Sequence, residues 1–174
     1  RRPYVIVVNH NTVIDIPALY YLPLNFRWVS KREVYKVPFF GQFLFLHGDI
    51  CIDRGRAAEA MEQLLREGRM WIARGASVAV FPEGTRTKDG NLGKLKSGAF
   101  VIAAEAGVDM IPCRIIYKGG KMRVFGRCTV VFGKPIPAEK LKLGEPRSAA
   151  RLRECKALLA EELEKLLEEN RQYL

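Results

Sequence analysis

YVIVVNHNTVID, residues 4–15, introduces the pattern that the rest of the chain repeats. Residues 4–8 are a short run rich in β-branched side chains, which is typical of a strand buried on both faces. The polar residues 9–12 end that run and predict a loop. Pro17 is favoured in the first turn of a helix, so we expect a helix over about residues 15–22. The stretch therefore predicts a strand, a loop and a helix in succession, the repeating unit of an α/β fold.

Short apolar runs and amphipathic segments continue to alternate along the chain. We predict further strands over residues 26–30, 50–52, 77–81, 110–117, 122–125 and 129–132. We predict helices over two short segments kinked within 31–46, and over 56–73, 97–106 and about 147–173. The Gly119-Gly120 pair predicts a hairpin turn between late strands. This order predicts one α/β domain over residues 1–174, with a mixed, mostly parallel sheet flanked by helices. The leucine stripe of the last helix suits packing on its own domain or against another chain.

Composition limits what kind of protein this is. The chain has 174 residues, 48% of them hydrophobic, which excludes a disordered chain and a small disulfide-stapled scaffold. A net charge of +10 points to an acidic partner: nucleic acid, an anionic membrane surface, or a phosphorylated substrate with an acidic carrier. The four cysteines are scattered, so we expect neither a zinc site nor disulfides, and a reducing, cytosolic setting. No initiator methionine precedes the first hydrophobic run, so we expect that a segment such as a membrane anchor is missing upstream.

His10 and Asp15 form the first candidate site, because a His and an Asp with four residues between them can face each other across a strand-to-helix turn. An Asp that accepts a hydrogen bond from one ring nitrogen orients the imidazole and leaves the other nitrogen as a general base. The alternative interpretation is a helix cap beside a satisfied polar pair. Metal binding is not indicated, since His47 is the only other histidine and no carboxylate cluster supplies further ligands.

The second candidate site is FPEGTR, residues 81–86, at the end of a predicted buried strand. Ligands of open α/β sheets collect at the carboxyl ends of the strands, and glycine amides, a hydroxyl and a guanidinium suit a phosphate. The candidate anion-binding residues are Gly84, Thr85, Arg86 and, nearby, Lys96. Glu83 is a further substrate-binding candidate, which would hold Arg86 in place or meet a substrate hydroxyl. The stretch GDICIDR, residues 48–54, ends another short strand with Arg54, and we expect Arg54 and Arg86 to form an anion clamp at two adjacent strand ends. The alternative in both cases is an exposed charged turn.

These stretches together resemble the glycerolipid acyltransferase family, specifically its 1-acyl-glycerol-3-phosphate acyltransferases, over about residues 4–137. The family's His-x4-Asp box corresponds to His10 and Asp15, and its Gly-led box ending in Arg to residues 48–54. FPEGTR is present unchanged, and Ile111-Pro112 matches the later apolar-Pro box. Four boxes in order at fitting distances make the resemblance specific. One departure is Cys51, where the second box often carries an aromatic residue.

The resemblance implies the glycerolipid acyltransferase fold and direct acyl transfer. His10, oriented by Asp15, would deprotonate the free hydroxyl of 1-acyl-glycerol 3-phosphate, which attacks an acyl thioester and gives phosphatidic acid for phospholipid synthesis. The anion-binding residues named above, with Arg54, would hold the acceptor's phosphate. The resemblance implies no metal or organic cofactor, acyl-CoA or acyl carrier protein as acyl donor, and no acyl-enzyme. It also implies the cytoplasmic face of the cell membrane as the location, peripherally or through an anchor.

Other interpretations remain beside this one. The same reaction on glycerol 3-phosphate or another lysophospholipid is the first alternative. A basic nucleic-acid-binding module is a distant one, and we expect no nucleic-acid partner because no recognition motif for nucleic acid is present. The apolar residues within 39–46 predict core packing, while an acyl groove or contact with lipid is the alternative.

Overall fold

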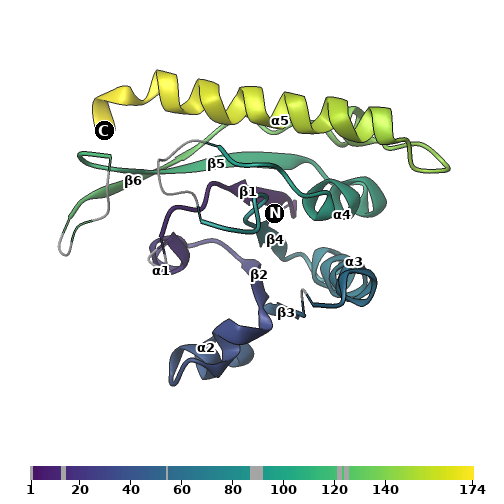
Figure 1. Cartoon of the computed structure of the whole chain (residues 1–174), viewed down its shortest axis with the longest axis horizontal. Coiled ribbons are helices and arrows are strands. Elements are labelled where there is room, and N and C mark those ends of the chain that lie inside the picture. Colours follow the sequence, from purple (N-terminus) through teal and green to yellow (C-terminus); the bar gives the residue numbers. More distant parts are fainter. Residues whose placement is uncertain (1, 13–14, 54, 87–91, 121–122, 124–125) are drawn as a thin grey trace.

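The computed structural model describes residues 2–174 except 13–14, 54, 87–91, 121–122 and 124–125. Within the described residues one sheet contains the strands β1 (Val5–Val8), β2 (Phe26–Lys31), β3 (Ile50–Ile52), β4 (Ser77–Val80), β5 (Met110–Tyr117) and β6 (Cys128–Phe132). The strand order is β3-β2-β4-β1-β5-β6, and every pairing is parallel except that of β5 with β6 (Figure 1). The predicted mixed, mostly parallel sheet with an antiparallel late region is confirmed.

Helices connect the strands and cover both faces of the sheet. The α-helices are α1 (Asp15–Tyr20), α2 (Phe40–His47), α3 (Ala57–Ala73), α4 (Gly98–Ala106) and α5 (Ala149–Glu169). Short 3-10 helices are η1 (Arg32–Lys36), η2 (Ala138–Leu141) and η3 (Arg171–Tyr173). The two kinked segments expected within residues 31–46 are therefore η1 and α2. The strand predicted over 122–125 lies mostly outside the described residues.

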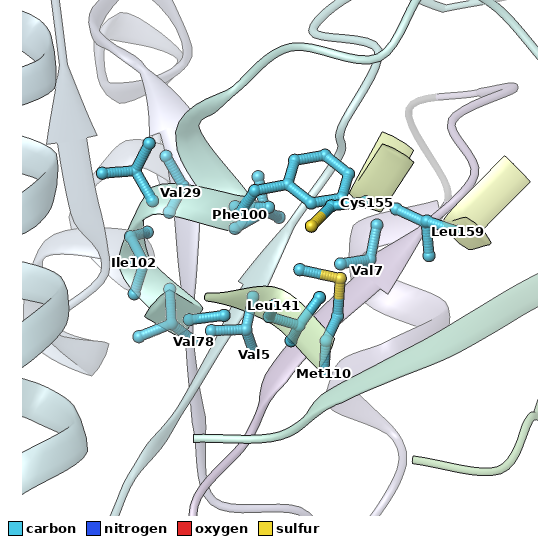
Figure 2. Close-up of a cluster of buried hydrophobic side chains, with 14 of the residues drawn as sticks. Val5, Val7, Val29, Val78, Phe100, Ile102, Met110, Leu141, Cys155 and Leu159 are labelled. Carbon is cyan, nitrogen blue, oxygen red and sulfur yellow. The ribbon is translucent and has the colours of Figure 1, made fainter. Parts of the chain in front are cut away.

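Strand β1 is apolar at every position because both of its faces are covered. Val5 and Val7 point into the larger buried cluster, formed with residues of α3, α4 and α5 (Figure 2). Ile6 and Val8 point to the opposite face, where they pack with Ile16 of α1 and other buried residues. Because both faces of β1 are covered, the residues that follow Val8 at its carboxyl end begin between two packed layers.

The C-terminal helix α5 packs on the sheet of its own chain. Its side chains Cys155 and Leu159 are buried in the larger cluster (Figure 2), and Leu163 belongs to the same cluster. The side-chain oxygen of Ser148 accepts a hydrogen bond from the Arg151 backbone N–H at 3.3 Å, which caps the helix and accounts for its start at Ala149 rather than at 147. Of the two packing alternatives for the leucine stripe, the structure has the first.

The expectation that the apolar residues within 39–46 are core is wrong for most of them. Leu44 is fully buried, but Phe39, Phe45 and Leu46 are 89%, 75% and 83% exposed. A short helix with apolar side chains all round can bury only the side that packs on the rest of the chain, which for α2 is mainly its contact with η1. Among the helices of the described residues, none is both long enough and apolar enough to cross a bilayer.

Candidate active site

The candidate residues gather where β1 and β4 end, because these parallel neighbours present their carboxyl ends at the same edge of the sheet. The loop after β1 carries His10 and leads into α1, which begins at Asp15. The loop after β4 carries residues 81–86. Asn9 fixes the first loop: its side-chain oxygen accepts from the Ile115 N–H at 2.7 Å, and its amide donates to the Ile115 carbonyl at 3.3 Å. The buried amide thereby continues the β1–β5 ladder by one residue, so His10 begins from a fixed point.

His10 and Asp15 meet across the turn, in the arrangement that their spacing predicts. The His10 Nδ1 lies 2.9 Å from the Asp15 Oδ2, and the Asp15 side chain is fully buried while that of His10 is 16% exposed. The same oxygen accepts the backbone N–H groups of Asn11 at 2.7 Å and Thr12 at 2.8 Å. With Nδ1 donating to a carboxylate that the loop itself holds in place, Nε2 is the ring nitrogen suited to accept a proton.

Tyr117, at the end of β5, completes the surroundings of the Asp15 carboxylate. Its hydroxyl donates to the Asp15 Oδ1 across 2.6 Å in a buried setting. Burial, with this hydrogen bond and the charge of Asp15, raises the pKa of Tyr117 above its ordinary value, so the hydroxyl keeps its proton and remains a donor. Sequence reasoning missed Tyr117, because it lies 102 positions from Asp15 and no local motif joins them.

An aromatic stack supports the imidazole ring. The His10 and Phe81 rings are stacked, with centroids 3.8 Å apart and an interplanar angle of 17°. Phe81 stacks in turn on the buried ring of Trp28, at 4.4 Å and 23°. Phe81 belongs to the FPEGTR stretch, but nothing in the sequence indicated that its ring faces His10.

Glu83 joins the two loops of the site. It is 3% exposed, and its Oε1 and Oε2 accept the backbone N–H groups of His10 at 3.4 Å and of Gly93 at 2.9 Å. Burial raises the pKa of Glu83. Its two hydrogen bonds and the electrostatic effects of His10 and Arg114 act in the opposite direction. These contacts make Glu83 a support of both loops. The expectation that it holds Arg86 in place or meets a substrate hydroxyl stays a prediction.

Arg114 is a second residue that the sequence did not single out. This β5 side chain is 3% exposed and donates to the Leu163 carbonyl of α5 at 2.9 Å. Burial lowers the pKa of its guanidinium, whereas the charges of Glu164 and Glu83 raise it. It therefore carries a buried positive charge between α5 and the candidate site.

The predicted anion-binding residues lie in and beside a turn after β4. The Gly84 N–H donates to the Phe81 carbonyl at 3.2 Å, and Gly84 has φ +71°, a conformation that favours glycine. After this turn Thr85 and Arg86 are exposed. The backbone N–H of Lys96, whose side chain is also exposed, donates to the Pro82 carbonyl at 2.7 Å. The structure thus brings Gly84, Thr85, Arg86 and Lys96 to the loops that Glu83 ties to His10.

Arg54 lies outside the described residues. It follows β3, and the expectation of adjacent strand ends is wrong, because β2 lies between β3 and β4. The order of the strands in the sheet could not be read from their order in the chain, since the connection from β3 through α3 crosses β2 before the chain enters β4. Next to Arg54, the carboxylate of Asp53 pairs with Arg32 at 3.4 Å.

Within the described residues no group of three or more His, Cys, Asp and Glu side chains could hold a metal ion. Burial raises the pKa of the Cys51 thiol, which leaves it a poor nucleophile at neutral pH.

Comparison with known proteins identifies the family. The sequence model of the Acyltransferase family matches residues 1–116. The chain is 36% identical over 160 residues to the 1-acyl-sn-glycerol-3-phosphate acyltransferase of Pseudomonas aeruginosa, covering 87% of this chain and 60% of that protein. It is 35% identical over 148 residues to the protein of the same name from Chlamydomonas reinhardtii, covering 80% of this chain and 44% of that protein. The chain thus spans about half the length of these curated relatives.

A solved structure agrees with the fold. The crystal structure of the 1-acyl-sn-glycerophosphate (LPA) acyltransferase PlsC from Thermotoga maritima superposes with a TM-score of 0.68 at 21% identity, over 95% of this chain and 66% of that one. This likeness confirms the expected fold. Since the family model spans two thirds of the sequence, including the His10–Asp15 pair and the FPEGTR stretch, the chain belongs to the Acyltransferase family.

Proposed function

We propose that this protein transfers a fatty acyl chain from an acyl thioester to the free hydroxyl of 1-acyl-glycerol 3-phosphate, giving phosphatidic acid. The observation that carries the proposal is the buried Asp15 carboxylate that holds Nδ1 of His10 at 2.9 Å. The names of the relatives favour this acceptor over glycerol 3-phosphate or another lysophospholipid.

In the proposed reaction His10 is the general base. Its Nε2 takes the hydroxyl proton as the acceptor oxygen bonds to the thioester carbonyl carbon. The tetrahedral intermediate then breaks its carbon–sulfur bond, and the leaving sulfur takes the proton back from the imidazolium. Asp15 acts by fixing the ring and stabilising its positive charge.

The phosphate of the acceptor would bind at the turn after β4. Arg86 offers a guanidinium fork and Thr85 a hydroxyl, with Lys96 beside them and Arg54 as a further candidate. Gly84, whose backbone N–H donates to the Phe81 carbonyl, would contribute by shaping the turn. Glu83 would contribute by holding this turn against the backbone of His10. Positioning of this kind converts binding energy of the headgroup into alignment of the reacting hydroxyl.

The donor would be acyl-CoA or acyl carrier protein, and the acyl group would pass directly between substrates. The raised pKa of Cys51 and of the fully buried Cys113 favours this direct route over an acyl-cysteine intermediate. We propose an anionic membrane surface as a further partner, at its cytoplasmic face, because the acceptor and the product are lipids and the chain carries a net charge of +10.

Product analysis by mass spectrometry tests the proposal. The protein is mixed with lysophosphatidic acid and either acyl-CoA or acyl carrier protein in mixed micelles, beside His10→Ala. We expect phosphatidic acid from the wild type and a rate lower by about 10²- to 10⁴-fold in the variant. His47→Ala is the matched control, since the His47 Nδ1 also pairs with an aspartate, Asp49, at 3.0 Å, and it should keep its activity.

A panel of acceptors completes this experiment. Faster turnover of glycerol 3-phosphate or another lysophospholipid than of lysophosphatidic acid would replace the proposed acceptor. Near wild-type turnover by His10→Ala would remove His10 from the mechanism.

A further inference from the structure

Helix α2 and the residues just before it expose several large apolar side chains. Within α2 the exposed apolar side chains are Phe43 at 45%, Phe45 at 75% and Leu46 at 83%, and Phe39, the residue before the helix, is 89% exposed. Val37, just before the helix, is 48% exposed. We define these five residues as the α2 apolar patch. Aromatic and leucine side chains gathered on one surface mark an interaction site more often than scattered ones do.

The fold holds this patch outward rather than leaving it loose. Helix α2 is anchored by the fully buried Leu44 and by His47, whose ring stacks on Phe43 and whose Nδ1 lies 3.0 Å from the buried carboxylate of Asp49. The turn from η1 into α2 requires glycine at Gly41, because a Cβ there would lie 2.0 Å from the Tyr35 carbonyl oxygen. A helix so firmly attached displays its free side in a defined direction.

The backbone at Phe39, the most exposed member of the patch, is strained. Its φ of +63° is a conformation that bulky side chains rarely adopt. Strain of this kind persists where the surrounding structure imposes it, and it clusters at functional sites. Here the strained residue is the most exposed member of the patch, so burial within the described chain does not offset the strain.

Charge next to the patch favours one kind of partner. Lys31, Arg32 and Lys36 are exposed on the segment that leads into α2. The carboxylate of Asp49, which pairs with His47 of α2, is buried. The acidic residues named here that are exposed are Glu33 and Asp53, which pairs with Arg32 at 3.4 Å, so the exposed charges of this segment keep a positive excess. Apolar side chains flanked by cations match the two layers of an anionic lipid surface, the acyl region and the headgroups.

We propose that the α2 apolar patch docks the protein on an anionic lipid bilayer, with Phe39, Phe45 and Leu46 entering the interface and Lys36 among the headgroups. This inference deepens the proposed function by naming the surface that meets the membrane, and it rests on that function only for its purpose. The docked helix would bring the enzyme to the layer in which a lysophospholipid acceptor resides.

Cosedimentation with vesicles tests the docking without any substrate. The probes are vesicles of phosphatidylcholine alone and of phosphatidylcholine with about one third phosphatidylglycerol. We expect binding of the wild type to the anionic vesicles, and at least about tenfold weaker partitioning of the triple variant Phe39→Ser, Phe45→Ser, Leu46→Ser. The matched control is Tyr173→Ser with Leu174→Ser, which removes exposed apolar groups at the C-terminus, far from α2 in Figure 1, and should bind like the wild type.

Two further variants test the details. Phe45→Trp should show a blue shift of its added fluorescence on anionic vesicles, since the ring leaves water. Lys36→Glu should weaken binding to anionic vesicles more than to neutral ones.

The outcomes separate this inference from the proposed function. Equal binding of wild type and triple variant, or no vesicle binding by the wild type, would overturn the docking surface. If size-exclusion chromatography showed that the wild type is a dimer and the triple variant a monomer, the patch would be reassigned to contact with a second copy of the chain. Activity is measured separately on a short-chain lysophosphatidic acid dissolved below its micellar concentration. There the triple variant should match the wild type, and a loss of turnover would reassign the patch to acyl-chain binding.

Discussion

The hydroxyl of Tyr117 donates to Oδ1 of Asp15, on the side of the carboxylate opposite to the one that holds His10. The three donors on Oδ2 come from residues 10–12, so the loop after β1 fixes one oxygen and β5 fixes the other. A carboxylate held at both oxygens cannot rotate. Its direction, and with it the direction of the imidazole, is set by two neighbouring strands of the sheet.

Tyr117→Phe should therefore lower kcat without changing KM. Removing the hydroxyl leaves the buried Oδ1 of Asp15 without this donor, which costs about 1–3 kcal/mol of stability and lets the carboxylate turn. We expect kcat to fall about tenfold while KM for both substrates stays near its wild-type value. Steady-state kinetics with lysophosphatidic acid and the donor, beside urea unfolding, measure both effects.

Tyr20→Phe is the control for a purely structural effect. The Tyr20 hydroxyl donates to the Asp49 carboxylate, a second Tyr–Asp contact outside the candidate site. This variant should lose similar stability and keep its kcat. If both variants lowered kcat equally, Tyr117 would be a structural residue and not a positioning one.

Glu83 predicts a pH dependence of stability. Because burial raises its folded pKa above the ordinary value of a glutamate, the folded state holds the proton more tightly than the unfolded state. Unfolding then releases a proton in the window between the two pKa values, and the free energy of unfolding falls as pH rises through that window. The loss amounts to about 1.4 kcal/mol for each pKa unit between the two states.

Glu83→Gln removes this contribution, since an amide does not titrate. Urea unfolding at about pH 4 and about pH 7 should show a smaller decrease in stability for Glu83→Gln than for the wild type. The comparison uses the pH slope, because the amide also alters the hydrogen bonds to His10 and Gly93 at every pH. Glu59→Gln, on the exposed surface of α3, should follow the wild type. Parallel slopes for Glu83→Gln and wild type would contradict the raised pKa.

The fold was largely predictable because burial on two faces leaves a strong local pattern. Apolar runs such as residues 4–8 and 77–81 differ from their polar ends, and each became a strand with ends within one residue. Strand order was not predictable, since the sequence holds no local sign that β2 lies between β3 and β4. The exposure of Phe39 and Phe45 was not predicted, because apolar character alone does not tell which side of a short helix packs against the rest of the chain.

The candidate site was predictable where it depends on short spacing. His10 and Asp15 meet because one turn joins them. Tyr117 reaches the site only because β5 lies beside β1 in the sheet, which brings together residues 102 positions apart. Arg114, on the same strand, donates to the Leu163 carbonyl of α5, 49 positions away. The contacts of Glu83 with two backbone N–H groups depend likewise on how two loops fold over each other.

Arg86→Ala should raise KM for the acceptor with little change in kcat. The side chain is exposed at the turn after β4, where the proposed phosphate binds. A hydrogen bond to a charged group contributes about 1.5–3 kcal/mol, so the expected rise in KM is about 10- to 100-fold. Arg86→Lys keeps the charge but loses the guanidinium fork, so its KM for the acceptor should lie between those of the wild type and Arg86→Ala. The control is Arg171→Ala, which removes an exposed arginine that pairs with Glu168 near the end of the chain. An unchanged acceptor KM in Arg86→Ala would remove this contact from the proposal.

Phe81→Leu tests whether the aromatic stack positions His10. Leucine retains an apolar side chain in the site but offers no flat face to the imidazole, which lies 3.8 Å from the Phe81 ring. Aromatic pairs contribute about 0.5–1.5 kcal/mol beyond burial, so freeing the ring should lower kcat by roughly 2- to 12-fold with KM unchanged. Phe81→Tyr keeps the ring and should restore kcat.

Phe26→Leu separates positioning by Phe81 from general support of Trp28. Phe26 is buried and meets Trp28 edge-on at 5.8 Å, so its loss disturbs the same tryptophan, whereas its ring is not the one stacked on His10. Both leucine variants should unfold at lower urea concentration than the wild type, but only Phe81→Leu should lose kcat. An equal loss of kcat in the two would mean that the stack acts through the stability of this face of the sheet, because Phe81 stacks on the imidazole of His10 and Phe26 does not.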